Sequence, residues 1–332
     1  MKYKMIGNTG VKVSCLCLGT MSFAGTADKE QSTQIFNRCR GEGINFIDCA
    51  NIYSAMKSEA LVGQLLEGCR DEFVLATKVG HPFGDGPEAG SLSRRHIMHQ
   101  VEKSLKRLRT DRIDFYFVHW FYEDIGMEET LRTLDDLVRQ GKILYPAVSN
   151  WAAWQITKAL GISTRQGWDA FRCIQPMYSL LKRQAEVEIF PLAQSEDLGV
   201  MTYSPLGGGM LTGKYTDGPP PEKGRIRDVE IYAKRYADES NLKIAADFVS
   251  LARKKGFDPP ALAVAWTMAH SAVTCPIIGA RKVEHLDAYL QAMKIEMTED
   301  LYQEISALTP APPVATDRSE ERYGPVKIPE KV

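Results

Sequence analysis

Four ionisable side chains follow short apolar runs of the sequence, and their types suit acid catalysis. Asp48 ends one run and Lys78 ends a second. His119 directly follows a third run, and Tyr53 lies shortly after Asp48. A phenol with a pKa of ~10 is a poor acid at pH 7 unless its neighbours favour loss of the proton. We expect Lys78 to lower the pKa of Tyr53, Asp48 to keep Lys78 charged, and His119 to orient a carbonyl group that Tyr53 protonates.

Each of these side chains also has an ordinary structural interpretation. Asp48 could cap a turn, and Lys78 could extend its ammonium to solvent. His119 could be a core histidine, and Tyr53 could pack a loop. Their occurrence at the ends of three successive apolar runs nevertheless favours a functional site, because perturbed ionisable groups gather at such sites.

Two further loops carry the chemistry of an anion site. Residues 203–209 read Tyr-Ser-Pro-Leu-Gly-Gly-Gly, and residues 279–282 read Gly-Ala-Arg-Lys. Glycine amides and basic side chains bind phosphate well, so these loops predict a phosphorylated ligand. The alternative is a pair of ordinary tight turns.

Other phosphate-binding and metal-binding motifs are incomplete in this sequence. Gly208, Gly213 and Lys214 approach a P-loop, but Tyr215 occupies the position of the magnesium-binding Ser or Thr. No G-x-G-x-x-G motif opens a helix after a strand, which argues against a dinucleotide-binding Rossmann fold. His96 and His99 have a spacing that could hold a metal, yet no carboxylate-rich partner accompanies them. We therefore predict no metal.

Eight short apolar or β-branched runs must position these residues. Seven of them begin about 30 residues apart, as strand-plus-helix units do. The predicted strands are 15–19, 44–48, 73–78, 113–118, 143–148, 172–176, 200–203 and 274–278. The predicted helices are 29–40, 58–67, 93–108, 127–140, 186–196, 241–255 and 261–269. Eight such units predict an α/β fold of the (β/α)₈ TIM-barrel type, with an open doubly wound sheet as the alternative.

Three additions extend this barrel. A predicted β-hairpin, residues 3–6 and 11–14 around a turn at 7–10, precedes the first strand and could cover the bottom of the barrel. A long loop of about 70 residues follows strand seven. We predict a single barrel domain over 1–308 and a Pro-rich C-terminal extension over 309–332.

Composition narrows the classes of partner and compartment. The 332 residues include 41 Lys plus Arg and 42 Asp plus Glu, for a net charge of −1, so nucleic acid is not an expected partner. No membrane span or signal peptide is apparent. The seven cysteines contain no C-x-x-C pair, which favours a reducing, cytoplasmic location.

Motifs along nearly the whole chain resemble those of the aldo-keto reductases. They include Phe-Ile-Asp at 46–48, Tyr-Ser at 53–54, Ala-Thr-Lys at 76–78, Tyr-Phe-Val-His at 116–119, Gly-Lys at 141–142, Val-Ser-Asn-Trp at 148–151, Gln-Pro-Met-Tyr at 175–178, Tyr-Ser-Pro-Leu at 203–206 and Leu-Thr-Gly-Lys-Tyr at 211–215. The resemblance implies an NADPH-dependent carbonyl reductase on a (β/α)₈ barrel. It also implies that Tyr53 is the proton donor of a tetrad completed by Asp48, Lys78 and His119.

The same resemblance implies a set of cofactor contacts. Ser149, Asn150 and Gln175 would bind the nicotinamide carboxamide, Tyr203 would stack on its ring, and the turn after Tyr203 would hold the pyrophosphate. In the branch that includes the potassium-channel β subunits, a lysine and an arginine of the long loop grip phosphates, and Lys214 and Arg225 match them. The implied cofactor-binding residues are Thr20, Asp48, Ser149, Asn150, Gln175, Tyr203, Ser204, Leu206, Gly208, Lys214, Arg225, Gly279, Arg281 and His285.

The chain departs from the family after strand eight. Gly279 and Arg281 fit the pattern, whereas His285, Ala288 and Tyr289 replace its residues for the adenosine end. Arg281 could still meet a 2′-phosphate, so NADPH is expected over NADH. His285 could add a pH-dependent contact.

The expected substrate is a small-molecule aldehyde or ketone of moderate size. Aromatic residues after the strand ends could form its pocket: Phe23, Phe83, Trp120, Phe121 and Trp151.

Two other functions stay open. One is an NADPH-binding regulatory subunit of a membrane protein with little or no turnover. The other is a barrel lyase or isomerase that uses Lys78 as a Schiff-base nucleophile, which the adjacent Asp48 disfavours. The oligomeric state is also open.

Overall fold

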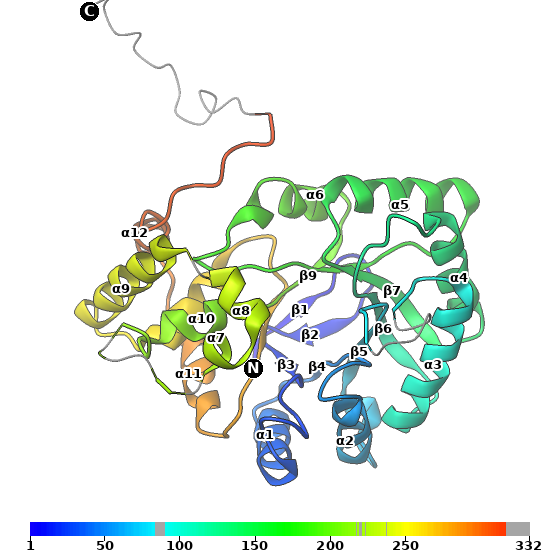
Figure 1. The fold of residues 1–332 in the computed structure, drawn as a ribbon, viewed down its shortest axis with the longest axis horizontal. Helices are drawn as coiled ribbons and strands as arrows, with labels where there is room; N and C mark the ends of the chain where they lie inside the picture. Colours follow the sequence, from blue (N-terminus) through cyan, green and yellow to red (C-terminus); the bar gives the residue numbers. More distant parts are fainter. Residues whose placement is uncertain (84–89, 217, 219–220, 223, 237, 317–332) are drawn as a thin grey trace, which may run out of the picture.

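Short apolar runs alternate with amphipathic segments along the chain, and together they form a closed barrel. The computed structural model describes residues 1–83, 90–216, 218, 221–222, 224–236 and 238–316. Within them, parallel strands close in the order β10-β3-β4-β5-β6-β7-β8-β9, surrounded by helices (Figure 1). The strands are β3 (Cys17–Gly19), β4 (Phe46–Asp48), β5 (Val74–Val79), β6 (Ile113–Val118), β7 (Ile143–Ser149), β8 (Cys173–Gln175), β9 (Gly199–Thr202) and β10 (Cys275–Ile278).

The predicted (β/α)₈ barrel is confirmed, because all eight predicted strands form and are parallel neighbours. Helices α1 to α6 follow β3 to β8 in turn. Their bounds are α1 (Lys29–Gly41), α2 (Lys57–Leu65), α3 (Arg94–Leu108), α4 (Met127–Arg139), α5 (Ala153–Gln166) and α6 (Ile189–Ser195).

Two of these helices differ from expectation. The sequence predicts no helix over 153–166, because Thr157 and Gly161 weaken its helical signal and Ala152 provides no side-chain cap. The predicted helix over 186–196 begins later, at Ile189. Pro191 is the reason, since a proline is tolerated only in the first turn of a helix.

The loop between β9 and β10 carries several helices of its own. It contains the 3₁₀ segment η3 (Gly207–Thr212) and then α7 (Arg225–Asp228), α8 (Glu230–Tyr236), α9 (Glu239–Lys254) and α10 (Pro259–Ala269). After β10 come α11 (His285–Ala292) and α12 (Glu299–Ser306). Helices α7, α8, α11 and α12 are not among those predicted. Figure 1 shows α7 next to α8, and both helices contact η3, the segment that follows β9.

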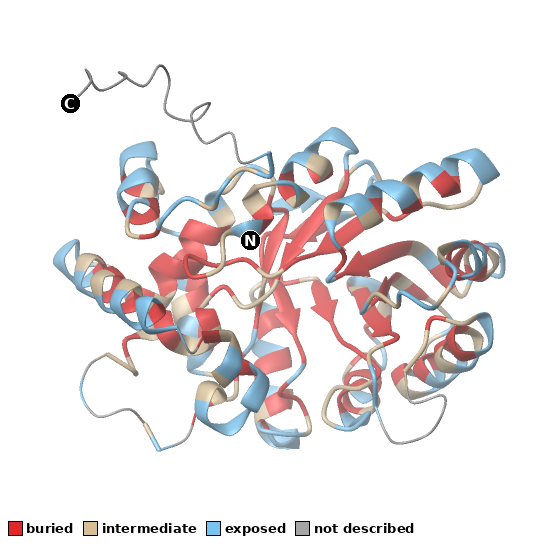
Figure 2. Cartoon of the chain, turned by 45° about the horizontal axis from the view of Figure 1, so that its top comes forward, coloured by how far each residue is buried: buried red, intermediate tan, exposed pale blue. Residues whose placement is uncertain are grey.

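Apolar residues form two buried regions, one inside the barrel and one between the strands and the helices. Figure 2 shows buried strands at the centre and helices whose outer faces are exposed. The barrel interior is lined by a separate cluster of buried side chains: Cys17, Phe46, Ala76, Phe115, Phe117, Ala147, Cys173, Met201 and Cys275.

Side chains alternate between the two faces of a β-strand, and this alternation determines which residues lie above the cluster. Side chains two residues apart point to the same face of a strand. The next inward residue after Phe46 is Asp48, and after Ala76 it is Lys78. The same step gives His119, Ser149, Gln175 and Tyr203 on the following strands. One register thus places an apolar layer below and a polar layer at the carboxyl ends of the strands.

The amino-terminal hairpin closes the opposite end of the barrel, as expected. β1 (Tyr3–Met5) pairs antiparallel with β2 (Lys12–Ser14). Ile6 and Val13 are fully buried among the side chains of the barrel interior. Gly199 makes room for this contact, because a Cβ atom there would lie 2.2 Å from Cγ2 of Ile6.

The predicted extension over 309–332 stays a prediction, because residues 317–332 lie outside the described part of the chain. In the described residues, no helix combines the length and the apolar character that crossing a bilayer requires.

The contact between α2 and α3 generates a stability prediction. A Cβ atom on Gly63 of α2 would lie 2.3 Å from the carbonyl oxygen of Arg107, which is backbone and cannot easily move. We expect Gly63→Ala to lower the free energy of unfolding by about 1–3 kcal/mol, as overpacking does. Gly161→Ala in α5 is the matched control, because nothing lies within 4 Å of its Cβ position. It should raise stability by about 0.5–1 kcal/mol. Equal effects of the two variants in chemical denaturation would contradict this packing argument.

Candidate active site

Lys78 is the centre of the polar layer. Its side chain is fully buried, and its ammonium donates to Oδ2 of Asp48 at 2.7 Å and to the carbonyl oxygen of Cys49 at 2.7 Å. Oδ1 of Asp48 lies 2.6 Å away, and the hydroxyl oxygen of Tyr53 lies at 3.0 Å. All the hydrogen-bonding capacity of the ammonium is therefore directed at the predicted tetrad and the backbone beside it.

His119 completes the predicted group of four. Its ring meets the ring of Tyr53 edge to face, with centroids 6.3 Å apart. Its backbone N–H donates to the carbonyl oxygen of Val79, which continues the strand pairing past the end of β6. Nδ1 of His119 is buried, and no described residue forms a hydrogen bond with it. The structure thus brings Asp48, Tyr53, Lys78 and His119 together at one end of the barrel.

The charges of the site follow from burial and from neighbouring groups. Burial acts to lower the pKa of Lys78, but attraction to Asp48 and Tyr53 outweighs burial, so the pKa of Lys78 is raised. Lys78 therefore stays an ammonium. The expectation for Tyr53 needs correction: burial raises its pKa more than Lys78 lowers it, so the pKa of the phenol is raised overall. Tyr53 holds its proton until a reacting group takes it.

His119 is held neutral. Burial lowers the pKa of its imidazole well below the ordinary value, and the charges of Lys78 and His81 lower it further. A neutral ring can donate a hydrogen bond to a carbonyl oxygen without adding a second cation to the site.

A chain of hydrogen bonds links the tetrad to the next inward residues. Nε2 of Gln175 donates to Oδ1 of Asp48 at 2.8 Å, and the Ser149 hydroxyl donates to the carbonyl oxygen of Gln175 at 2.8 Å. The Asn150 amide donates to the carbonyl oxygen of His119 at 3.0 Å. Oδ1 of Asn150 accepts from the Tyr203 hydroxyl at 2.7 Å. Residues expected to hold a nicotinamide therefore lie in direct contact with the tetrad or one step from it.

The turn after β9 has the shape of a phosphate cradle. Ser204 and all three glycines of 207–209 adopt positive φ angles. A Cβ atom on Gly209 would lie 2.8 Å from Nζ of Lys214, so the ammonium lies directly over this turn. Successive backbone amides together with a cation form an anion site. Leu206 and Gly208 lie within the same turn.

The cations around this turn form no ion pairs among the described residues, although the Asp228 carboxylate acts on Lys214 from a distance. Burial lowers the pKa of Lys214, and the like charges of Arg281 and Arg225 lower it further. Among the residues that the structure describes, none of the three forms an ion pair with a carboxylate. Such a group of cations is stabilised by a bound anion, so the residues present fit a dinucleotide with phosphates.

The departures after β10 have structural explanations. The Tyr289 hydroxyl donates to the carbonyl oxygen of Gly279 at 2.9 Å. Nδ1 of His285 accepts from the backbone N–H of Arg281 at 3.4 Å. Both substituted residues therefore support the loop that carries Arg281. Burial lowers the pKa of His285, and Arg281 adds to this effect, so the ring remains an acceptor.

The aromatic residues predicted to line the substrate pocket differ in how far their side chains are exposed. Phe83 and Trp120 are 45% and 46% exposed, so their rings are available at the surface. Phe121 is partly buried and packs edge to face against the buried Trp151. Phe23 is fully buried in the core, which corrects the idea that it lines an open pocket. Thr20 is also fully buried, and its hydroxyl donates to the carbonyl oxygen of Asp48.

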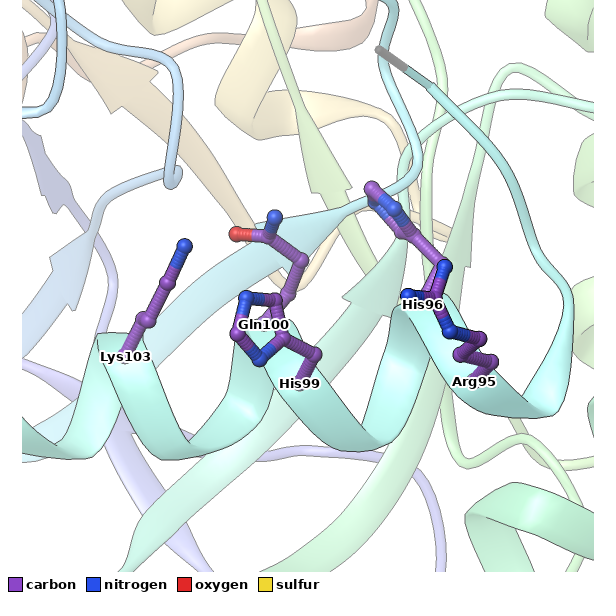
Figure 3. Close-up of a pocket in the computed structure, with 5 residues that line it drawn as sticks. All are labelled: Arg95, His96, His99, Gln100 and Lys103. Carbon is purple, nitrogen blue, oxygen red and sulfur yellow. The ribbon is translucent and has the colours of Figure 1, made fainter. Parts of the chain in front are cut away.

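His96 and His99 line a hollow of about 380 Å³ on α3, together with Arg95, Gln100 and Lys103 (Figure 3). Gln100 accepts a hydrogen bond from Asn51, in the loop between Asp48 and Tyr53. The basic side chains around the hollow disfavour a metal cation there. In the described part of the chain, no group of three His, Cys, Asp or Glu side chains could hold a metal ion.

Two residues at the site escape the sequence analysis. The ring of His81 lies 5.2 Å from that of His119 and 5.9 Å from that of Trp120. His81 comes shortly after β5, so its position beside a strand end could have indicated it. Arg235 of α8 lies 6.0 Å from the ring centroid of Tyr203. No local signal marks Arg235, because its approach depends on how the long loop folds.

Comparison with known proteins gives matches over nearly the whole chain. A model described as the aldo/keto reductase family matches residues 15–310. The uncharacterized oxidoreductase YrpG of Bacillus subtilis (strain 168) is 34% identical over 323 residues, or 94% of this chain and 97% of that protein. A probable voltage-gated potassium channel subunit beta of Arabidopsis thaliana is 32% identical, with 89% and 92% covered. Norsolorinic acid reductase B of Dothistroma septosporum is 31% identical, with 93% and 82% covered.

The depressed pKa of His119 generates a pH prediction. An unfolded histidine has a pKa of ~6.5. Below that pH, His119 binds a proton in the unfolded chain but stays neutral in the folded protein. The contribution of His119 to the free energy of unfolding is fully present above pH ~6.5. It falls by up to about 1.4 kcal/mol per pH unit as the pH drops toward the pKa of His119 in the folded protein. We expect His119→Asn to lose less stability than the wild type between pH 7 and pH 5. Urea titrations at several pH values measure this difference, and parallel curves would contradict it.

Proposed function

Because the chain belongs to the aldo/keto reductase family, we propose that it reduces an aldehyde or ketone to an alcohol with NADPH, using Tyr53 as the proton donor. Membership of this family makes the chain an NAD(P)H-dependent oxidoreductase. The observation that carries the finer proposal is the buried Lys78, whose ammonium contacts both Asp48 and Tyr53.

The proton step follows from the charges around Tyr53. The cofactor, held by Ser149, Asn150, Gln175 and Tyr203, would supply a hydride to the carbonyl carbon, and the electron pair of the C=O bond would move to oxygen. Tyr53 gives its proton to that oxygen, which completes the alcohol and leaves a tyrosinate. Lys78 stabilises the tyrosinate at the 3.0 Å contact, and Tyr53 regains a proton from solvent. In alcohol oxidation, Tyr53 accepts the proton instead.

The roles of Asp48 and His119 are to prepare this step. Asp48 keeps Lys78 charged. A buried ammonium without a counter-ion tends to lose its proton. His119, as a neutral ring, donates to the carbonyl oxygen and orients it toward Tyr53. Because these groups are fixed before the substrate arrives, little reorganisation accompanies the reaction.

The cofactor contacts form three groups. Ser149, Asn150 and Gln175 would bind the carboxamide, and Tyr203 would stack on the nicotinamide ring. The turn with Ser204, Leu206 and Gly208 would hold the pyrophosphate. Thr20, whose hydroxyl donates to the carbonyl oxygen of Asp48, would contact the cofactor after β3. Lys214, Arg225 and Arg281, with Gly279 and His285 behind them, would take the remaining phosphates. This excess of unpaired cations supports NADPH over NADH.

The substrate pocket would lie beside Tyr53 and His119. The exposed ring of Trp120 meets His81, whose ring lies beside His119, and Phe83, also exposed, follows His81 by two residues. Phe121 and Trp151 would form its deeper wall. A small-molecule carbonyl compound of moderate size suits such a surface.

Relatives named as probable potassium channel β subunits support a second candidate. In that case the chain would bind NADPH and regulate a membrane protein with little or no turnover. Both functions use the same cofactor site, so only turnover distinguishes them.

The cysteines support a cytoplasmic location. All seven are free and buried in the described structure, which suits a reducing compartment. We also retain the proposal of one barrel domain over 1–308 followed by an extension over 309–332.

Tyr53→Phe tests the proton donor. Removing the hydroxyl removes the acid but keeps the ring, so kcat for carbonyl reduction should fall by ~10²-fold or more. The NADPH dissociation constant should stay near that of the wild type. NADPH oxidation with a panel of aldehydes and ketones measures the first quantity, and fluorescence titration measures the second. A fully active variant would exclude Tyr53 as the donor, whereas a wild type that binds NADPH and reduces nothing would favour the regulatory function.

Arg281→Leu tests the choice of cofactor. If Arg281 binds a 2′-phosphate, its loss should weaken NADPH binding by about 10-fold or more, as expected for a charge-assisted pair. NADH lacks that phosphate and serves as the internal control, so its binding should change little. Equal losses for both cofactors would assign Arg281 to a shared part of the dinucleotide.

A further inference from the structure

Arg235 is a cation without an acidic partner at the rim of the site. Its guanidinium lies over two aromatic rings, 6.0 Å from the centroid of Tyr203 and 4.9 Å from that of Tyr232. The neighbouring Lys234 pairs with Glu230, but no carboxylate of the described residues forms an ion pair with Arg235. Contact with aromatic rings offsets only part of the cost of burying a guanidinium. Because Arg235 is half-buried, a bound anion would stabilise its charge further.

The position of Arg235 is fixed by the residues around it. Tyr232 and Tyr236 of the same helix are buried, with 7% and 3% of their surfaces exposed. The ring of Tyr236 packs against the glycine turn, because a Cβ atom on Gly208 would lie 3.1 Å from it. Arg235 is therefore held over Tyr203 by anchored neighbours on both sides.

Contacts connect Arg235 to the reacting groups. Tyr203, which lies under the guanidinium, donates its hydroxyl to Asn150, and Asn150 donates to the backbone of His119. The Asn150 side chain is exposed, so this side of the mouth is open to a ligand. An anion bound at Arg235 would lie beyond Tyr203, on the cofactor side of the mouth, at a distance from the tetrad.

The cations assigned to the cofactor form a separate group. The charges that act on Lys214 are those of Arg281 and Arg225, whereas Arg235 acts on Tyr203 and Tyr236. Arg235 thus faces the nicotinamide end and the mouth of the site. It is the cation available to a second ligand.

We infer that the substrate carries a carboxylate remote from its carbonyl group and that Arg235 binds this carboxylate. The inference rests on the proposed carbonyl reduction and narrows its substrate class. A planar guanidinium matches a carboxylate with two parallel hydrogen bonds. The exposed ring of Trp120, which is linked to His119 through His81, offers an apolar surface near the carbonyl end of such a substrate.

Two aldehydes that differ in charge and by one methyl group test this inference. 4-Carboxybenzaldehyde carries the remote carboxylate, and methyl 4-formylbenzoate is its neutral ester. We expect Arg235→Met to lower kcat/KM for the acid by about 10-fold to 100-fold, the range for a charged hydrogen-bonded contact. The ester should change by less than about 3-fold. Lys234→Met is the matched control, since it removes an exposed cation of the same helix, and it should leave both substrates unchanged.

A second measurement separates this inference from the proposed function. 4-(Hydroxymethyl)benzoate and its methyl ester are titrated into the NADP⁺-loaded protein, and binding is followed by tryptophan fluorescence. If Arg235→Met weakens binding of the acid and not of the ester, the inference is supported. A wild type that reduces neither aldehyde would count against the proposed function and not against this inference. Equal binding of the acid to wild type and variant would overturn the inference. An equal loss for acid and ester, with weaker NADPH binding, would also overturn it and assign Arg235 to the cofactor.

Discussion

A lysine ammonium buried at the end of a closed barrel is the constraint on which the site depends. Lys78 has no exposed surface, so its charge must be neutralised and hydrogen-bonded by the protein itself. Asp48 supplies the counter-charge, and Gln175 in turn holds Asp48. The position of Tyr53 against the same ammonium follows from this arrangement. One costly buried charge therefore organises residues from three strands and the loop that carries Tyr53.

The barrel can contain this charge because its interior is divided into layers. Phe46 lies two residues before Asp48, and Ala76 lies two residues before Lys78, so β4 and β5 each contribute an apolar residue below and a polar residue above. The apolar layer gives a dry floor on which electrostatic interactions are strong. The polar layer is open only on the side of the loops, where ligands bind in barrels of this type.

Much of this architecture is predictable from local sequence. The strands are visible because parallel strands buried on both faces form continuous apolar runs. Asp48, Lys78 and His119 can be found because they lie at the ends of such runs. What depends on three-dimensional environment is harder to predict. The pKa of Tyr53 is raised because burial outweighs Lys78, a balance that spacing cannot reveal. Arg235 reaches Tyr203 only through the fold of the long loop, and α5 forms despite weak helical signals because its apolar face is buried against the barrel.

The amino-terminal hairpin covers a barrel interior that side chains such as Phe46 and Phe115 already fill, so the site has a single opening. Ile6 and Val13 seal its floor, so neither substrate nor product can pass through the barrel axis. In the proposed reduction, cofactor and substrate would both reach Lys78 through this opening, and the one bound deeper would enter first and leave last. The packed interior below Lys78 would thereby fix the order of exchange, and the rate at which the outer ligand departs would limit how quickly the inner one is exchanged.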